Sequence, residues 1–264
     1  MKAPFIVDAH AHTGVMSMFF CPEATAADLL SRMDRLGIRC CINAGSWAGL
    51  TQGGAGALEG LRREHEESRG RIFYLGPFDP RRGREALREL EQACHGPGLA
   101  GIKIHPTFHH TAAEDPLYEP LWRFAEERDL TVMSHSWSSS ERNPGQALSL
   151  PRRFETWVRR HPGVRLVLAH AGGRGDGRAD AVRLAREHPG VYLDLAGDIF
   201  CFRLLERLAD EVPPGKLLFG SDFPWLDPRA NLSRILCAGV PTGLKRRILR
   251  DNALEAYKLK VTGS

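Results

Sequence analysis

The sequence predicts an α/β protein folded as a (β/α)8 barrel, and three observations lead to this class. Short apolar runs alternate with longer amphipathic runs along the chain. Eight such pairs fit into 264 residues, the usual size of this barrel. The first run ends in Asp-Ala-His-Ala-His, residues 8–12, whereas the alternative, a doubly wound open sheet, normally begins with a glycine-rich phosphate loop. We therefore expect one domain covering residues 1–264.

Eight strands are expected, each an apolar run bounded by turn residues. Because helical segments separate them, neighbouring strands should be parallel and covered by helices on their outer face. In chain order the expected strands are Pro4–Ala9, Cys40–Ala44, Ile72–Phe78, Gly101–His105, Thr131–His135, Val164–Ala169, Val191–Leu195 and Lys216–Gly220.

The segments between these strands have helical composition and spacing, as Leu29, Met33 and Leu36 show in the first of them. Turn-forming pairs such as Pro162-Gly163 separate them from the strands. The expected helices are Ala24–Leu36, Ala57–Arg69, Arg84–Cys94, Pro116–Glu127, Ala147–Arg160, Ala179–His188, Cys201–Ala209 and a closing segment, Pro228–Lys258, broken near Pro241.

Composition excludes several classes of partner. Hydrophobic residues make up 42% of the chain and charged residues 26%, and the net charge of +4 is too small and dispersed to indicate nucleic acid or a membrane surface. The six cysteines form no C-x-x-C pair, so we expect a reduced, cytoplasmic protein. No signal peptide or membrane-spanning segment is expected.

Chemically competent side chains gather at the predicted strand ends, where a barrel places its catalytic groups. Any one of them alone is more often structural, but their coincidence at five ends favours a common site. They are His10 and His12 after the first strand, Lys103 and His105 in the fourth, His135 in the fifth, His170 after the sixth and Asp222 after the eighth. His10 and His12 alternate along a strand, so both imidazoles can face one metal ion.

These motifs resemble a known family. The combination of D-A-H-x-H, G-x-K-x-H-P, S-H, A-H-x-G-G and G-S-D-x-P-W, running from Asp8 to Trp225, resembles the amidohydrolase superfamily, and its amidohydrolase-2 branch most closely. The resemblance implies a metal-dependent barrel enzyme with one divalent ion, expected to be zinc, held by His10, His12, His135 and Asp222. Asp222 would also transfer a proton, and His170 would orient the attacking water or stabilise negative charge.

Lys103 has more than one interpretation. A lysine in an apolar strand is costly unless it is paired or modified. The resemblance implies either a carbamylated lysine that bridges a second metal ion or a cation that holds a substrate carboxylate, and a structural ion pair is the third possibility. Because Ile102 and Ile104 should pack outward against the helices, Lys103 and His105 should face the barrel interior. We predict that Lys103 is catalytic.

Three further residues are predicted to contact substrate. His105 shares a strand face with Lys103 and is a candidate ligand, substrate contact or partner of that lysine. Trp137 follows His135 in a serine-rich loop, and Arg174 follows His170, where it can meet an anionic group.

The predicted activity is metal-dependent hydrolysis of an amide, ester or lactone bond in a small molecule, through a water that the metal activates. The alternative within the same branch is a metal-dependent non-oxidative decarboxylase of aromatic or enoic acids. A second alternative is a non-catalytic barrel that binds a ligand. A homo-oligomer is left open, and the substrate is not named.

Overall fold

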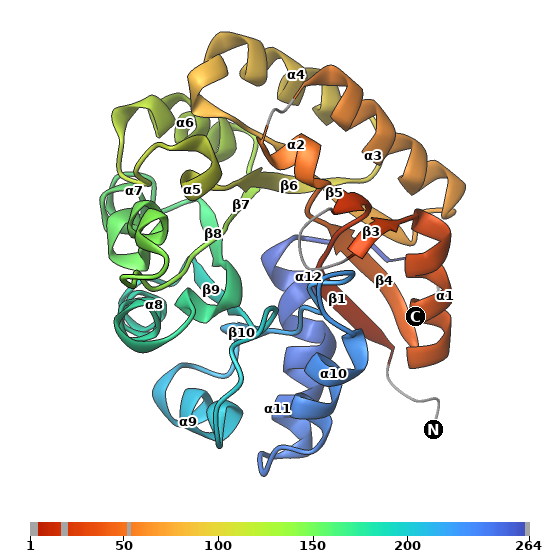
Figure 1. Ribbon diagram of the computed structural model, residues 1–264, viewed down its shortest axis with the longest axis vertical. Helices are drawn as coiled ribbons and strands as arrows, with labels where there is room; N and C mark the ends of the chain where they lie inside the picture. Colours follow the sequence, from red (N-terminus) through yellow and green to blue (C-terminus); the bar gives the residue numbers. More distant parts are fainter. Residues whose placement is uncertain (1–4, 17–20, 52–53, 262–264) are drawn as a thin grey trace.

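Eight parallel strands form the barrel, arranged in chain order (Figure 1). The computed structural model describes residues 5–16, 21–51 and 54–261. The strands are β1 (Ile6–Ala11), β4 (Ile38–Asn43), β5 (Ile72–Pro77), β6 (Leu99–Ile104), β7 (Thr131–Ser134), β8 (Arg165–Leu168), β9 (Val191–Asp194) and β10 (Leu217–Leu218). Each overlaps a predicted strand, so the barrel prediction is confirmed.

The segment after β10 closes the barrel against β1. The amide of Ala9 donates to the carbonyl of Phe219 at 2.8 Å, and the amide of Asp222 donates to the carbonyl of His10 at 2.8 Å. These bonds bring Asp222 to the end of β1, beside His10.

The last strand, β10, is shorter than the predicted Lys216–Gly220 because a helix takes one of its hydrogen bonds. The amide of Phe219 donates to the carbonyl of Ile248 at 3.0 Å. Ile248 lies in a π-helical turn, Arg247–Asp251, whose wider hydrogen-bonding pattern differs from that of an α-helix. The C-terminal segment therefore takes part in closing the barrel.

Helices surround the sheet (Figure 1). Pro241 separates two of the closing helices, as predicted. The α-helices are α1 (Ala26–Leu36), α2 (Trp47–Thr51), α3 (Ala55–Glu67), α4 (Arg84–Cys94), α5 (Pro106–His109), α6 (Glu119–Glu127), α7 (Glu155–Arg160), α8 (Gly175–Glu187), α9 (Leu204–Glu211), α10 (Pro228–Leu236), α11 (Thr242–Arg246) and α12 (Asn252–Ala256).

The region between the first two barrel strands differs from the prediction. Helix α1 begins after Thr25, whose side chain forms a capping box with Asp28. Before it, β2 (Gly14–Met16) pairs with β3 (Cys21–Ala24) in an antiparallel hairpin that the sequence analysis did not predict. Such short strands show too little alternation to be recognised from sequence.

About half of the predicted helix Ala147–Arg160 is 3₁₀ structure. Two 3₁₀ segments, Pro144–Ser149 and Pro151–Phe154, precede the short α7. Pro151 explains the break, because a proline disfavours the α conformation of the residue before it, and Leu150 is extended with ψ of 131°.

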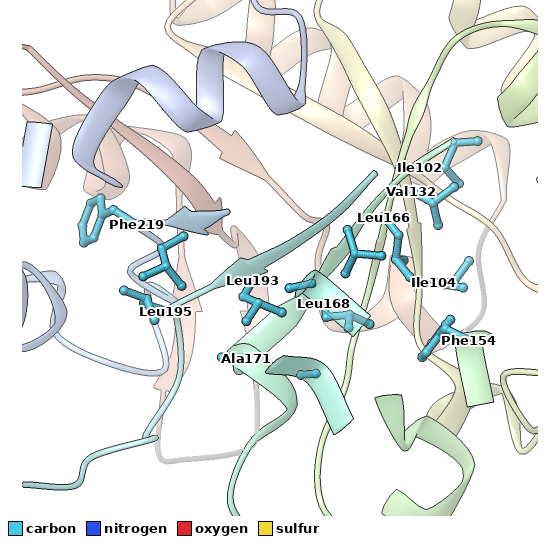
Figure 2. Close-up of a cluster of buried hydrophobic side chains, with 14 of the residues drawn as sticks. Ile102, Ile104, Val132, Phe154, Leu166, Leu168, Ala171, Leu193, Leu195 and Phe219 are labelled. Atoms are coloured by element: carbon cyan, nitrogen blue, oxygen red, sulfur yellow. The ribbon is translucent and has the colours of Figure 1, made fainter. Parts of the chain in front are cut away.

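Two apolar layers hold the barrel together. The outer layer lies between strands and helices and includes Ile102, Ile104, Val132 and Leu166 (Figure 2). The inner layer contains the alternate strand residues, such as Met133 and Val167, together with Ala253, Ala256 and Tyr257 of the C-terminal segment. Ile102 and Ile104 therefore pack outward as expected. Burial of both faces explains why the strands are apolar throughout.

Within the described part of the chain, no helix is both long and apolar enough to cross a membrane.

Candidate metal centre

Three of the four predicted metal ligands meet at the C-terminal ends of the strands. Among the described residues, His10, His12 and Asp222 offer ligand atoms that all lie within 4.8 Å of one another. The Nε2 atoms of His10 and His12 are 3.1 Å apart. Oδ1 of Asp222 lies 3.5 Å from Nε2 of His12 and 3.8 Å from Nε2 of His10. Their side chains converge from β1 and from the segment after β10.

The hydrogen bonds on the far side of each imidazole decide which nitrogen carries the proton. Nδ1 of His10 lies 3.0 Å from Oδ2 of Asp194, and Nδ1 of His12 lies 2.6 Å from the carbonyl oxygen of Gly45. Both partners accept hydrogen bonds, so each neutral imidazole carries its proton on Nδ1. The two Nε2 lone pairs therefore point toward each other without a proton between them.

This donor set fits a divalent cation. Oδ1 of Asp222 is buried and has no hydrogen-bond partner among the described residues. Two unprotonated imidazole nitrogens and a carboxylate oxygen repel one another, and although Nζ of Lys103 lies 3.2 Å from Nε2 of His10, this combination of donor atoms suits zinc and related ions. The exposed fractions of His10, His12 and Asp222 are 1%, 1% and 5%, so solvent screens this repulsion little.

Burial and neighbouring groups shift the pKa values of His10 and Asp222. Burial, reinforced by the nearby Lys103 ammonium, holds the pKa of His10 well below its usual value, which keeps the imidazole neutral as a ligand requires. Burial alone would raise the pKa of Asp222, but its polar contacts with the adjacent imidazoles, that of His12 first, outweigh this effect and lower it. The carboxylate is therefore ionised in the physiological pH range.

Lys103 faces the barrel interior, as predicted. Its Nζ lies 3.2 Å from Nε2 of His10 and 3.3 Å from Sδ of Met133. Burial lowers its pKa to about 8, while Asp194 and Asp222 act in the opposite direction. The lysine nitrogen thus approaches the same lone pair of His10 that faces His12.

His135, the fourth predicted ligand, lies beside the cluster rather than in it. Its Nε2 is 2.9 Å from Oε1 of Gln146. Its ring stacks on His105 with centroids 4.0 Å apart, and His105 stacks on Phe108 with centroids 3.6 Å apart. Burial lowers the pKa of both histidines, and a neighbouring imidazole acts in the same direction on each: His135 on His105, and His170 on His135. The three rings therefore form a face-to-face stack beside the cluster, with His105 in the middle.

The two remaining predicted substrate contacts lie farther out. The Trp137 ring is nearly parallel to the His135 ring, with centroids 6.3 Å apart, and meets His170 edge-on at 5.5 Å. Arg174 is exposed, and its guanidinium binds the backbone oxygen of Asp198 at 2.9 Å and the carboxylate of Asp198 at 3.2 Å. Trp137 therefore borders the buried rings, whereas Arg174 is in an exposed ion pair.

His170 packs against the cluster from the β8 side. Its ring centroid is 5.2 Å from that of His10 and 5.1 Å from that of His135. Its amide donates to Oδ1 of Asp194 at 2.9 Å, and its backbone is left-handed, with φ of 60°. Nδ1 of the ring is buried, and no described residue hydrogen-bonds to it.

Gly197 makes room for the His170 ring, which leads to a first prediction. Its φ is +84°, and an added Cβ would lie 2.5 Å from Nδ1 of His170. We expect Gly197→Ala to destabilise the protein by about 1–3 kcal/mol and to lower activity by displacing the ring. Urea unfolding and turnover measurements test this.

A matched control separates backbone strain from the clash. Gly37 also has a positive φ of +70°, but an added Cβ would meet nothing within 4 Å. Gly37→Ala should therefore show only the backbone effect on stability and retain activity. Equal stability and equal activity of the two variants would contradict the role given to Gly197.

Nearly the whole chain is similar to a known protein family. Residues 7–259 match the family model Amidohydro_2, described as amidohydrolase. The chain belongs to the amidohydrolase-2 family.

Relatives of this amidohydrolase-2 protein include decarboxylases and hydrolases. A 6-methylsalicylic acid decarboxylase from Aspergillus aculeatus is 28% identical over 187 residues, covering 60% of this chain and 50% of that protein. The match thus spans about half the length of that curated relative.

Two solved structures illustrate the fold. One is a 5-carboxyvanillate decarboxylase from Novosphingobium aromaticivorans, crystallised with manganese and a nitrobenzoic acid. It has a TM-score of 0.78, 12% identity and coverage of 97% of this chain and 96% of that chain. The other is a probable 2-pyrone-4,6-dicarboxylic acid hydrolase from Acinetobacter baumannii, with a TM-score of 0.71, 15% identity and coverage of 96% and 99%.

Two carboxylates of the amidohydrolase-2 site were not predicted as site residues. Asp194 ends β9, is fully buried and contacts both His10 and His170. The sequence feature that could have identified Asp194 is its position as a carboxylate at the end of an apolar strand, Val-Tyr-Leu-Asp. Asp8 accepts the amides of His10 at 3.1 Å and Ser221 at 2.9 Å, and burial raises its pKa to about 7. It ties the two ligand-bearing segments together.

Proposed function

We propose that this amidohydrolase-2 protein is a metal-dependent, non-oxidative decarboxylase of a small aromatic or enoic carboxylic acid. The observation that carries the metal dependence is the convergence of two unprotonated imidazole nitrogens and the Asp222 oxygen, which has no hydrogen-bond partner in the described part of the chain. The similarity to a curated decarboxylase supports decarboxylation over the hydrolysis expected from sequence. Because that similarity covers half of the relative, the reaction and substrate class remain proposals.

We infer that His10, His12 and Asp222 hold the ion. A divalent cation bound there supplies positive charge that holds a substrate oxygen and stabilises negative charge as it develops. His135 as a fourth ligand stays a prediction, and so does zinc as the metal, because one structural relative contains manganese. A second ion bridged by a carbamylated Lys103 is likewise a prediction.

Decarboxylation breaks the bond between the carboxyl carbon and the neighbouring carbon and leaves an electron pair on that neighbour. A proton must then be delivered to it as carbon dioxide departs. Asp222 and His170 are the proposed proton-transfer groups, because both lie at the cluster. Because Asp222 is ionised, it would first take a proton from water and then pass that proton to the carbon that has lost carbon dioxide. Lys103 supplies the buried positive charge that a substrate carboxylate or its developing charge requires.

The surrounding rings favour a flat substrate. Phe108, His105 and His135 form a face-to-face stack with 5° between neighbouring planes, and Trp137 is nearly parallel to His135. Flat rings stack favourably on exposed aromatic faces, so Trp137 is proposed as a stacking contact for the substrate. His105 is also proposed as a substrate contact, but through its ring edge, because Phe108 and His135 cover its two faces. Arg174 remains a predicted contact for an anionic group, for which it would have to leave Asp198.

The test supplies the protein with zinc or manganese and offers hydroxybenzoic acids alongside small lactones, esters and amides. Release of carbon dioxide from an acid supports the proposal. Cleavage of a lactone, ester or amide without carbon dioxide would support the second candidate, hydrolysis, which the likeness to a probable 2-pyrone-4,6-dicarboxylic acid hydrolase favours. Ligand binding without turnover in either metal-loaded form would support the non-catalytic alternative.

His170→Asn provides a second prediction. We expect turnover to fall about 10²–10⁴-fold, because the ring is proposed to move a proton rather than hold the metal. Metal content, measured by elemental analysis after dialysis, should stay near that of the parent. Loss of metal as complete as in His12→Ala would make His170 a ligand instead.

A further inference from the structure

The metal ligand His12 is oriented by groups that lie outside the ligand cluster. We propose that Asn43 and Glu64 are positioning residues that aim the Nε2 lone pair of His12 at the metal. The inference rests on the proposed function for the metal centre only, and not for the reaction or substrate.

The first step links His12 to a turn after β4. Nδ1 of His12 donates to the carbonyl oxygen of Gly45 at 2.6 Å. This carbonyl lies beyond the strand pairing, in which the last bond is from the amide of Ala44 to the carbonyl of Ala11. The position of the Gly45 peptide must therefore be set by other contacts.

The second step links Gly45 to Asn43. The amide of Gly45 donates to Oδ1 of Asn43 at 2.9 Å, which forms an Asx turn. Gly45 has a φ of +96°, a conformation that favours glycine. The Asn43 side chain thus fixes the turn that directs the Gly45 carbonyl at His12.

The third step links Asn43 to helix α3. Nδ2 of Asn43 donates to Oε2 of Glu64 at 2.7 Å and to Oγ1 of Thr13 at 2.6 Å. The Thr13 hydroxyl in turn donates to Glu64, 2.9 Å from either carboxylate oxygen. An ionised carboxylate can only accept hydrogen bonds. Glu64 therefore holds the Asn43 amide with its NH₂ toward Glu64 and its oxygen toward the Gly45 amide.

The two imidazoles of the centre are therefore oriented by different means. His10 meets the Asp194 carboxylate directly, at 3.0 Å. His12 meets a backbone carbonyl whose place depends on Asn43 and, through it, on Glu64. Asn43 and Thr13 are buried, so a broken link is not replaced by bulk water. If Gly45 turned away, the His12 proton could move to Nε2 and block metal binding.

The test compares Glu64→Ala, Glu64→Gln and Asn43→Ala in metal-free protein titrated calorimetrically with Zn²⁺ or Mn²⁺. Removing such an outer partner typically weakens metal binding about 10–100-fold, which is the loss expected for both alanine variants. Glu64→Gln keeps an oxygen that accepts from Asn43 and should largely restore affinity. Glu67→Ala, at the exposed end of the same helix, is the control and should bind metal like the parent.

One further measurement and a fallback variant complete the test. Nitrogen-15 NMR of the metal-free variants should show His12 shifting from one tautomer toward a mixture. If Asn43→Ala does not fold, Glu64→Ala provides the same test. The proposal would be overturned if the variants lost stability but kept the metal affinity and the His12 tautomer of the parent. The hydrogen bonds of Asn43 and Glu64 would then only attach α3 to the barrel.

The same experiment distinguishes failure of the proposed metal centre from failure of the positioning role of Asn43 and Glu64. If the parent binds neither ion, the proposed metal centre is wrong, and the NMR comparison alone then decides whether Asn43 and Glu64 control the tautomer of His12.

Discussion

Asp222→Asn is expected to lose its bound divalent ion and with it all measurable turnover. The asparagine keeps the shape of the side chain but replaces an anionic oxygen that lies 3.5 Å from Nε2 of His12. Removing one partner of a buried charge pair costs about 3–5 kcal/mol, which corresponds to about 10²–10⁴-fold weaker metal binding. Calorimetric titration of the metal-free variant with Zn²⁺ and with Mn²⁺ measures this loss.

The control for this variant is Asp210→Asn, on the exposed surface of α9, which should bind metal and turn over like the parent. His12→Ala should lose metal as Asp222→Asn does, because the first removes a converging nitrogen and the second replaces the anionic oxygen by a neutral amide. If Asp222→Asn retained stoichiometric metal with the affinity of the parent, Asp222 would not be a ligand. Its proposed role would then be limited to proton transfer.

The barrel was predictable because its signals are local and repeated. Each strand is an apolar run between turn residues, and burial of both sheet faces explains the absence of polar alternation. The two-residue β10 illustrates the limit of this approach. The residue after it, Phe219, donates its amide to Ile248, which is distant in the sequence, so the length of the strand depends on contacts that no local pattern records.

The core of the site was predictable for a related reason. Parallel strands bring their C-terminal ends to one edge, so His10, His12, Lys103 and Asp222 had to meet there once the strands were assigned. His135 is at the expected strand end, but its ring orientation is set by stacking on His105 and by Gln146. Such side-chain choices depend on packing that strand assignment does not give.

The orienting groups were not predictable by the same logic. Asp194 resembles any carboxylate that follows a strand, and only its contacts with His10 and His170 distinguish it. Glu64 lies in a charged helix whose other acids are mostly exposed, and nothing in its sequence context separates it from Glu66 or Glu67. Residues that act through others are determined by tertiary contacts rather than by motif.

Lys103→Met is expected to abolish most activity without lowering stability. The lysine is 2% exposed, and burial lowers its pKa from 10.5 to about 8. In the unfolded chain the amine keeps its ordinary pKa, so between pH 8 and 10.5 the unfolded state binds more protons than the folded state. The lysine therefore reduces stability below about pH 8, and this penalty disappears as the pH rises to 10.5.

Methionine fills much of the same apolar volume and removes the charge. In metal-free protein at pH 7 the variant should be as stable as the parent or more stable, by at most about 3 kcal/mol. The rise in stability that the parent shows between pH 8 and 10.5 should be absent, which urea unfolding at several pH values will measure. Lys260→Met, at an exposed position, is the control and should retain the rise.

The second part of this prediction concerns the turnover of Lys103→Met. The Lys103 nitrogen lies 3.2 Å from Nε2 of His10, a candidate metal ligand. An apolar residue at this position would be more stable, so the lysine is retained at the expense of stability. We expect Lys103→Met to lower turnover by at least about 10²-fold, the effect of losing one group that stabilises developing charge. A stable variant with parental turnover would remove Lys103 from the reaction, and a variant that loses stability at pH 7 would show that Lys103 supports the fold.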